Sequence, residues 1–264
     1  MRALLIWLAT GLTLSAGGQR VASYAPGATR TLIDLGCAED IVMATRWCPL
    51  PREHPARRDA DVFQPDLERL LQTKPDLVVL PRMANPLWAD KCAKAGLRIL
   101  VLHAEARDSS SRDILQLGQA TGREENARKL ATQLTAPSKR TAKRIIVIWD
   151  GVMAGPESYL AEPLAAAGLA SALSAGSWIR FDWELIATQR PDALLWVQNS
   201  GADSLLAPSQ AKTAEARQIP AIRELTCVRE GRIYVVNNSG NWLPGSGLNK
   251  TIPELIELRN VLGD

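Results

Sequence analysis

Histidine is scarce in this chain of 264 residues, where His54 and His103 are the only two. A site for a bare zinc or manganese ion takes several imidazole and carboxylate ligands, and a Ser-His-Asp triad needs an imidazole beside its nucleophile. The G-x-S-x-G elbow, the P-loop and the G-x-G-x-x-G fingerprint are also absent. The sequence therefore predicts no bare metal-ion site, no catalytic residues and no resident cofactor, and we do not expect an enzyme.

Long hydrophobic runs are missing too. The one extended run covers residues 3–14 and is too short to cross a bilayer. Arg2 precedes it and Ala16-Gly17-Gly18 follows it, the order of a secretory signal peptide that is cleaved before Gln19. A first buried strand or helix is the alternative interpretation. No cysteine follows the run, so we expect a soluble protein that is exported to the periplasm and carries no lipid anchor.

The chain has few cysteines. The four cysteines form no C-x-x-C motif, and Cys37, Cys48 and Cys92 all lie in the first half of the chain. Because export permits disulfides, we expect one bridge among these three, with free buried thiols as the alternative.

The formal net charge is only +3, and the basic clusters at 56–58 and 138–144 are short. We therefore expect no nucleic-acid partner.

Strand-like and helix-like segments alternate along the chain. Apolar runs such as 76–81 and 144–149 are typical of strands that are buried on both faces, and amphipathic stretches separate them. This alternation predicts an α/β protein whose sheets are mainly parallel and flanked by helices. The segment 46–65 contains four prolines, and we expect it to be a long irregular loop.

One segment occurs nearly twice. DLERLLQTKPDLVVL (66–80) and DWELIATQRPDALLW (182–196) align at an offset of 116 positions, with acids, a basic residue and Pro-Asp in the same places. We interpret both as the same helix–turn–strand unit in two similar Rossmann-like lobes. The chain is long enough for two lobes of about 100–130 residues each.

The segment 109–134 is the only long helical stretch without an intervening strand, and Gly122 divides it. We expect its second part to connect the lobes. The predicted organisation is a signal peptide (1–18), an N-terminal α/β lobe (19–122), a bridging helix (123–142) and a C-terminal α/β lobe (143–264). Two such lobes enclose a cleft, which is a favoured place for a small ligand.

Tryptophan is abundant for a chain with only two phenylalanines and three tyrosines. Its ring is large and its indole N–H needs a partner, so it suits the wet edge of an apolar pocket. Ligands of open parallel sheets lie beyond the carboxyl ends of the strands. Packing of each ring between helix and sheet is the alternative. The tryptophans at expected strand ends or in or beside loops are Trp47, Trp88, Trp149, Trp178, Trp196 and Trp242.

Segments spread over the whole mature chain resemble one known group. They are, in order, RVASYAPGATRTLIDLG, DIVMATRWCPLP, PDLERLLQTKPDLVVL, AGLRILVL, LGQATGREENARKLA, WIRFDWELIATQRPDALL and VREGRIYVVN. The group is the periplasmic substrate-binding proteins of ABC importers for metal chelates, the iron-siderophore and cobalamin class. The resemblance implies a class III periplasmic binding protein fold, in which a single bridging helix joins two lobes and the ligand cleft lies between them. It also implies a monomer that delivers its chelate to a membrane permease.

The resemblance assigns roles to particular residues. One exposed glutamate on each lobe, Glu68 and Glu184, is expected to dock into arginine pockets of the permease, where charge pairs set the orientation. The plainer role of each is to complement a helix dipole. The ligand loops of the group map onto the turns that follow the strands. The expected ligand-binding residues are Tyr24, Pro26, Gly27, Arg46, Trp47, Arg82, Trp88, Trp149, Tyr159, Trp178 and Trp242.

Two ligand classes stay open. Tryptophans favour a corrinoid such as cobalamin, whereas Arg46, Arg82 and Arg180 favour an anionic ferric siderophore. The tryptophans are more numerous, so we lean towards a corrinoid, with His54 as a candidate axial ligand for its cobalt. Arg30 departs from the pattern of the group, which often has an acid there. A tetrapyrrole chelatase, or a chelate scavenger with the same fold, is the alternative function.

Overall fold

A parallel sheet forms the N-terminal lobe. The computed structural model describes residues 19–103, 106–135, 143–198, 206–237 and 239–263. The sheet has the strand order β3-β2-β1-β4-β5, and every pairing in it is parallel. Its strands are β1 (Val21–Ser23), β2 (Ile41–Thr45), β3 (Arg57–Ala60), β4 (Leu77–Pro81) and β5 (Arg98–Leu102). Its helices are α1 (Pro26–Asp34), α2 (Leu67–Gln72) and α3 (Pro86–Lys94).

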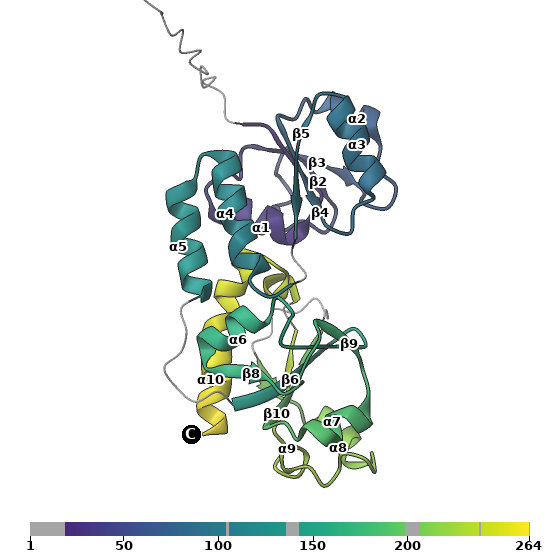
Figure 1. The fold of residues 1–264 in the computed structure, drawn as a ribbon, viewed down its shortest axis with the longest axis vertical. Coiled ribbons are helices and arrows are strands. Elements are labelled where there is room, and N and C mark those ends of the chain that lie inside the picture. Colours follow the sequence, from purple (N-terminus) through teal and green to yellow (C-terminus); the bar gives the residue numbers. More distant parts are fainter. Residues whose placement is uncertain (1–18, 104–105, 136–142, 199–205, 238, 264) are drawn as a thin grey trace, which may run out of the picture.

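Both faces of this sheet are covered. Side chains alternate across a strand, so Leu77 and Val79 of β4 pack into the core on the α1 side, whereas Val78 and Leu80 pack against α2 and α3. Figure 1 shows α2 and α3 on the far side of the sheet from α1. The apolar run of β4 is therefore explained by burial on two faces, as the sequence predicts.

The C-terminal lobe is built on a mixed sheet of order β11-β12-β10-β6-β7-β9, to which β8 adds beside β6. Pairings of β6 with β8 and β10, and of β10 with β12, are parallel, whereas β7, β9 and β11 join antiparallel. The strands are β6 (Lys143–Trp149), β7 (Val152–Ala154), β8 (Leu169–Ser171), β9 (Trp178–Arg180), β10 (Ala193–Val197), β11 (Ala207–Pro208) and β12 (Ile233–Val236). The helices are α6 (Ala161–Ala167), α7 (Trp183–Gln189), α8 (Gln210–Arg217), α9 (Thr226–Arg229) and α10 (Thr251–Leu262).

The repeated segments are α2–β4 and α7–β10. Asp66 and Asp182 are the N-caps of the two helices: Asp66 accepts one hydrogen bond from a backbone N–H of the first turn, and Asp182 accepts two. Lys74 and Arg190, which follow the helices, have φ angles of 44° and 46°. These are left-handed conformations that non-glycine residues seldom adopt, and here they turn the chain sharply from helix to strand.

The repeated Pro-Asp serves the same unit. Asp76 accepts a hydrogen bond of 2.8 Å from the backbone N–H of Arg20, and its own N–H donates to the Arg20 carbonyl at 2.7 Å. Asp192 makes the same reciprocal pair with Arg144, at 2.7 Å and 2.7 Å. Each aspartate thus ties the start of one central strand to its neighbour, which explains why the chain repeats it.

Two consecutive helices run along the side of the molecule (Figure 1). They are α4 (Ser109–Thr121) and α5 (Glu124–Thr135), and Gly122, with φ of 69°, ends the first. The N terminus of α4 meets the C-terminal lobe, since the N–H of Ser111 donates to the Glu162 carboxylate. The predicted bridging helix 123–142 begins with α5, and its last residues, 136–142, lie outside the described residues. The two-lobe α/β fold is confirmed, while the domain boundaries stay a prediction.

A segment that follows β12 locks the lobes together. It contains the 3-10 helices η1 (Ser239–Trp242) and η2 (Ser246–Lys250) and lies against α1 and α5. The N–H of Ser246 donates to Thr31 at 3.0 Å, its hydroxyl donates to Asp34 at 2.7 Å, and Asn249 donates to the Leu130 carbonyl at 3.0 Å. One hydrophobic core contains buried residues of both lobes. The lobes therefore share packing and are not joined by a linker alone.

Some expectations about local structure are wrong. The predicted loop 46–65 contains β3, an edge strand whose sequence, Arg-Arg-Asp-Ala, gives no apolar signal. Residues 219–225, whose apolar spacing is typical of a helix, form a series of turns, and β5 is a partly exposed edge strand although its sequence is mostly apolar. An edge strand has one unpaired side that meets water, so its sequence need not alternate between apolar and polar residues.

The expected disulfide is also wrong, because all four cysteines are free and buried. Cys37 and Cys48 pack in the core shared by the lobes, whereas Cys92 packs on the opposite face of the N-terminal sheet and Cys227 in the core under α9. The sheet thus separates Cys92 from the first two. Among the residues that the structure describes, no helix has the length and hydropathy needed to cross a membrane.

Candidate functional site

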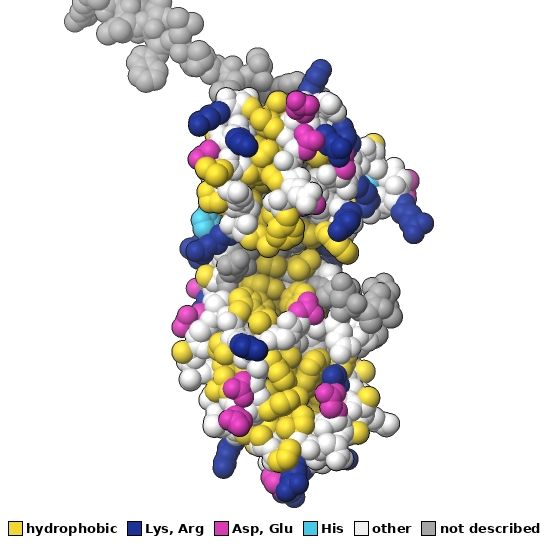
Figure 2. Space-filling view, turned by 90° about the vertical axis from the view of Figure 1, so that its right-hand side faces the viewer, with side chains coloured by type: hydrophobic (Ala, Val, Ile, Leu, Met, Phe, Trp, Pro, Cys, Tyr) yellow, Lys and Arg dark blue, Asp and Glu magenta, His cyan; other side chains and the backbone are white. Residues whose placement is uncertain are grey.

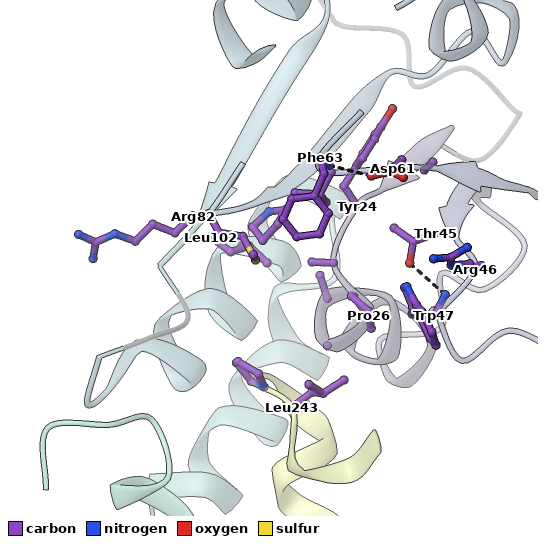
Figure 3. Close-up of a pocket in the computed structure, with 18 of the residues that line it drawn as sticks. Tyr24, Pro26, Thr45, Arg46, Trp47, Asp61, Phe63, Arg82, Leu102 and Leu243 are labelled. Atoms are coloured by element: carbon purple, nitrogen blue, oxygen red, sulfur yellow. Dashed lines mark hydrogen bonds between the residues drawn. The ribbon is translucent and has the colours of Figure 1, made fainter. Parts of the chain in front are cut away.

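A pocket of about 570 Å³ opens at the carboxyl ends of the N-terminal strands. This is where an open parallel sheet is expected to hold a ligand, and the volume is ordinary for a small-molecule site. Among the residues that the structure describes, the C-terminal lobe contributes Tyr159, Leu243 and Pro244 to the wall. The remaining wall belongs to the turns after β1, β2, β3 and β4 and to the end of β5 (Figure 3).

Two exposed aromatic rings stand at the pocket. Trp47 is 69% exposed and Phe63 is 79% exposed, although rings of this size are usually packed away. Local structure holds both in place: Asp61 accepts hydrogen bonds from the N–H groups of Phe63 and Gln64 at 2.8 and 3.1 Å, and the N–H of Trp47 donates to Thr45 at 3.3 Å. Figure 3 shows the two rings on different sides of the cavity. They offer apolar faces to a flat ligand.

The two tyrosines of the pocket do not offer free hydroxyls. Tyr24 is buried against Trp88, with ring centroids 6.2 Å apart and an edge-on arrangement. The hydroxyl of Tyr159 donates to the Trp242 carbonyl at 3.1 Å, and its ring lies 5.4 Å from that of Trp178. Burial raises the pKa of both tyrosines well above its usual range. Neither phenol is therefore a ready anionic ligand for a metal.

The charged groups of the pocket are balanced. Arg58 donates to the carbonyls of Leu50 and Pro51, and its guanidinium is thus occupied. Asp59 is paired with Arg57 at 2.5 Å, and that hydrogen bond lowers the pKa of the Asp59 carboxyl below its usual value.

The two rim arginines are less engaged. The guanidinium of Arg46 lies 4.9 Å from the centre of the Trp47 ring, a cation–π contact. Arg82 is exposed, and Figure 3 shows it extending away from the cavity. The geometry does not form an arginine fork that would grip an anionic chelate from two sides.

The structure brings together seven of the eleven expected ligand residues. Four lie elsewhere: Trp88 and Trp242 are buried in the core, and Trp149 and Trp178 are half-buried outside the wall. Their binding roles stay predictions. The seven in the wall are Tyr24, Pro26, Gly27, Arg46, Trp47, Arg82 and Tyr159. Wall residues that the sequence did not indicate include Arg58, Val62, Phe63, Met83, Leu243 and Pro244.

His54 does not serve as the axial ligand considered for it. Its Nε2 lies 3.0 Å from the Ala38 carbonyl, and its Nδ1 accepts the N–H of Ala56 at 3.1 Å. Both ring nitrogens are thus engaged by backbone groups, and His54 is not among the described wall residues. The described wall residues include no histidine, cysteine or glutamate.

Glu68 and Glu184 occupy equivalent places on the two lobes. Each lies in the first turn of its helix, α2 or α7, and each side chain is exposed. Among the described residues neither carboxylate has a hydrogen-bond or ion-pair partner. The other acids of the repeat are used by the backbone, so these two are the ones left free to meet another molecule.

The chain is similar in sequence to two curated binding proteins. A cobalamin-binding protein of Halobacterium salinarum is 23% identical over 267 residues, covering 94% of this chain and 69% of that protein. A vitamin B12-binding protein of Pectobacterium carotovorum is 32% identical over 134 residues, covering 48% of each.

Solved structures show the same fold. The periplasmic vitamin B12-binding protein of Vibrio cholerae superposes with a TM-score of 0.69, is 16% identical, and covers 93% of this chain and 98% of its own. A periplasmic heme-binding protein of the same species gives 0.72 at 17% identity, covering 93% and 99%. The profile of the family described as periplasmic binding protein matches residues 21–239, most of the chain. The chain therefore belongs to the periplasmic binding protein family, as its resemblance to the chelate-binding group implies.

Proposed function

We propose that this protein captures a corrinoid in the pocket of its N-terminal lobe and delivers it to an ABC-transporter permease. The observation that carries the proposal is the wall itself, in which the exposed rings of Trp47 and Phe63 flank a largely apolar hollow. Burying the apolar faces of a flat chelate against these rings favours binding by roughly 25 cal/mol for each Å² removed from water.

The wall offers few donor groups to a heme iron. A five-coordinate heme iron gains an imidazole, phenolate, thiolate or thioether ligand from its protein. Apart from the Met83 thioether, the described wall residues offer none of these in accessible form, because both tyrosines are buried and their hydroxyls lie in the core. A corrinoid whose two axial positions are already filled needs no such ligand. The names of the curated relatives point the same way.

Binding is tested by titrating residues 19–264 with cyanocobalamin, heme and ferric catecholate, hydroxamate and citrate complexes, using isothermal calorimetry. We expect saturable sub-micromolar binding of cyanocobalamin alone. Trp47→Ala and Phe63→Ala should each weaken it about tenfold or more, since each removes roughly 1.5–3 kcal/mol of apolar burial. Val261→Ala is the control, because Val261 is 71% exposed on α10 outside the pocket. Tighter binding of an anionic ferric complex would overturn the corrinoid assignment.

Delivery rests on Glu68 and Glu184. In the proposal each enters a basic pocket of one permease subunit, and the fixed spacing of the lobes sets the pose. The double variant Glu68→Ala/Glu184→Ala should bind cyanocobalamin as the parent does but should no longer stimulate ATP hydrolysis by the reconstituted transporter. Glu125→Ala is the control, an exposed acid on α5. Full stimulation by the double variant would refute the docking role.

Related assignments follow from the family. We propose that the mature chain acts as a monomer in the periplasm after removal of residues 1–18, which lie outside the described residues. A chelatase-like enzyme would need a histidine or glutamate for metal insertion, and neither occurs among the described wall residues. A scavenger without a transporter differs only in its partner, so the same ATPase assay separates the two.

A further inference from the structure

Sulfur is exposed at only one place among the described residues, and that place is the pocket. All four cysteines are buried. Met43 is 1% exposed and Met153 is fully buried, whereas Met83 is 60% exposed and belongs to the pocket wall. Oxidants reach exposed sulfur first, so this distribution concentrates their attack on a single wall residue.

The turn after β4 fixes Met83 in this position. The N–H of Ala84 donates to the Pro81 carbonyl at 2.9 Å, which closes a four-residue turn. Met83 is the third residue of that turn, and its side chain is exposed among the described residues. Its thioether is soft and polarisable and is suited to contact the flat face of a conjugated ring.

We propose that Met83 is a site of two-electron oxidation by peroxides, and that its oxidation switches the pocket to low affinity for a chelate. In the reaction a sulfur lone pair attacks one peroxide oxygen, an S–O bond forms and the O–O bond breaks. The sulfur is oxidised by two electrons, and hydrogen peroxide is reduced to one water molecule. The second half of the proposal rests on the proposed function, whereas the first half does not.

The product changes the wall chemically. A sulfoxide is polar and strongly hydrogen-bonded to water, so covering it with an apolar chelate face costs desolvation that a thioether does not. A chelate seated against the exposed Met83 side chain would also cover its sulfur and so slow the attack of peroxide on it. A loaded protein should therefore resist oxidation, while an empty one is sensitive.

The full mature chain is treated with dilute hydrogen peroxide, and peptide mass spectrometry follows each methionine. We expect Met83 to oxidise at least about tenfold faster than Met43 and Met153, which serve as internal controls. Cyanocobalamin affinity should fall about tenfold, as expected when the burial of one methionine side chain is lost. It should return after treatment with methionine sulfoxide reductases, and saturating cyanocobalamin should slow the oxidation of Met83.

The variant Met83→Leu distinguishes oxidation of Met83 from oxidation elsewhere in the protein. Each protein is compared with its own affinity before peroxide, and the affinity of the leucine variant should not change on treatment. Equal oxidation rates for the three methionines, unchanged affinity of the oxidised parent, or an equal loss in the variant would each overturn the proposal. Failure of the untreated protein to bind cyanocobalamin would contradict the proposed function instead, and the panel chelate that does bind then becomes the probe.

Discussion

Gly27→Ala tests the junction between the lobes. Gly27 is the second residue of α1, and its backbone faces the chain between η1 and η2. A Cβ at this position would overlap the carbonyl oxygen of Pro244 and would lie 3.1 Å from the carbonyl carbon of the same residue. Both partners are backbone atoms, so no side-chain rotation relieves the clash. One segment must retreat by roughly 1.5 Å to reach ordinary contact distance.

The sign of the change in stability distinguishes overpacking from helix propensity. Helix propensity alone predicts that alanine stabilises a helical glycine position by about 1 kcal/mol. Overpacking predicts the opposite, a loss of about 1–3 kcal/mol. The retreat also disturbs the hydrogen bond between the Ser246 N–H and Thr31, worth about 1 kcal/mol. We expect a net loss of about 2 kcal/mol, which lowers the melting temperature by roughly 4–8 °C for a chain of this size.

Differential scanning calorimetry of the mature chain measures this change, and cyanocobalamin titration shows whether the pocket, which Gly27 also lines, is disturbed with it. Gly36→Ala is the matched control. Gly36 has a φ of 83° with open space where a Cβ would be built, so it reports backbone strain of about 1 kcal/mol without a clash. A Gly27→Ala variant that melts at or above the parent temperature would refute the tight junction.

Three further predictions concern buried groups. Burial raises the pKa of Glu162, so the folded state holds the Glu162 proton more tightly than the unfolded state does, and the free energy of unfolding falls as the pH rises past the ordinary carboxyl range. Urea titrations should therefore show that Glu162→Gln stabilises the protein at pH 7 but not near pH 4. Tyr159→Phe leaves the buried Trp242 carbonyl without its donor and should cost about 1–3 kcal/mol in the same assay. Burial raises the pKa of Cys92 and Cys227 to about 11, so an aromatic disulfide reagent at pH 8 should release no chromophore until the protein is denatured.

The alternation of apolar strands and amphipathic helices sufficed to predict the two-lobe α/β fold. The repeat was informative because its residues interact with the backbone: they cap helices, form turns and hydrogen-bond to neighbouring strands. These roles require particular residue types at fixed spacing. β3 escaped prediction because its four residues lie at an edge and include three charged side chains. The mixed edges of the C-terminal sheet also escaped, since strands of two or three residues are too short to show a period.

The site was harder to predict because the sequence does not reveal which way an aromatic ring points. Trp47 and Trp242 both follow strands, yet one is 69% exposed at the pocket and the other is 1% exposed in the core. Phe63 lies beyond a proline-rich segment with no periodic pattern. The hydrogen bonds that Asp61 accepts hold the backbone of Phe63 so that its ring lies at the pocket. Exposure of this kind depends on tertiary packing, so strand-end position alone favoured too many tryptophans.

In the proposed function, capture and delivery use different parts of the molecule. Nearly all of the pocket wall that the structure describes belongs to the N-terminal lobe, so a ligand in this pocket would meet mainly that lobe. The shared core and the segment after β12 hold the lobes in one relation. That relation fixes the positions of Glu68 and Glu184, which lie on different lobes. In the proposed transport function, a rigid junction would present both acids to the permease together, and loosening it should impair delivery even where the chelate still binds.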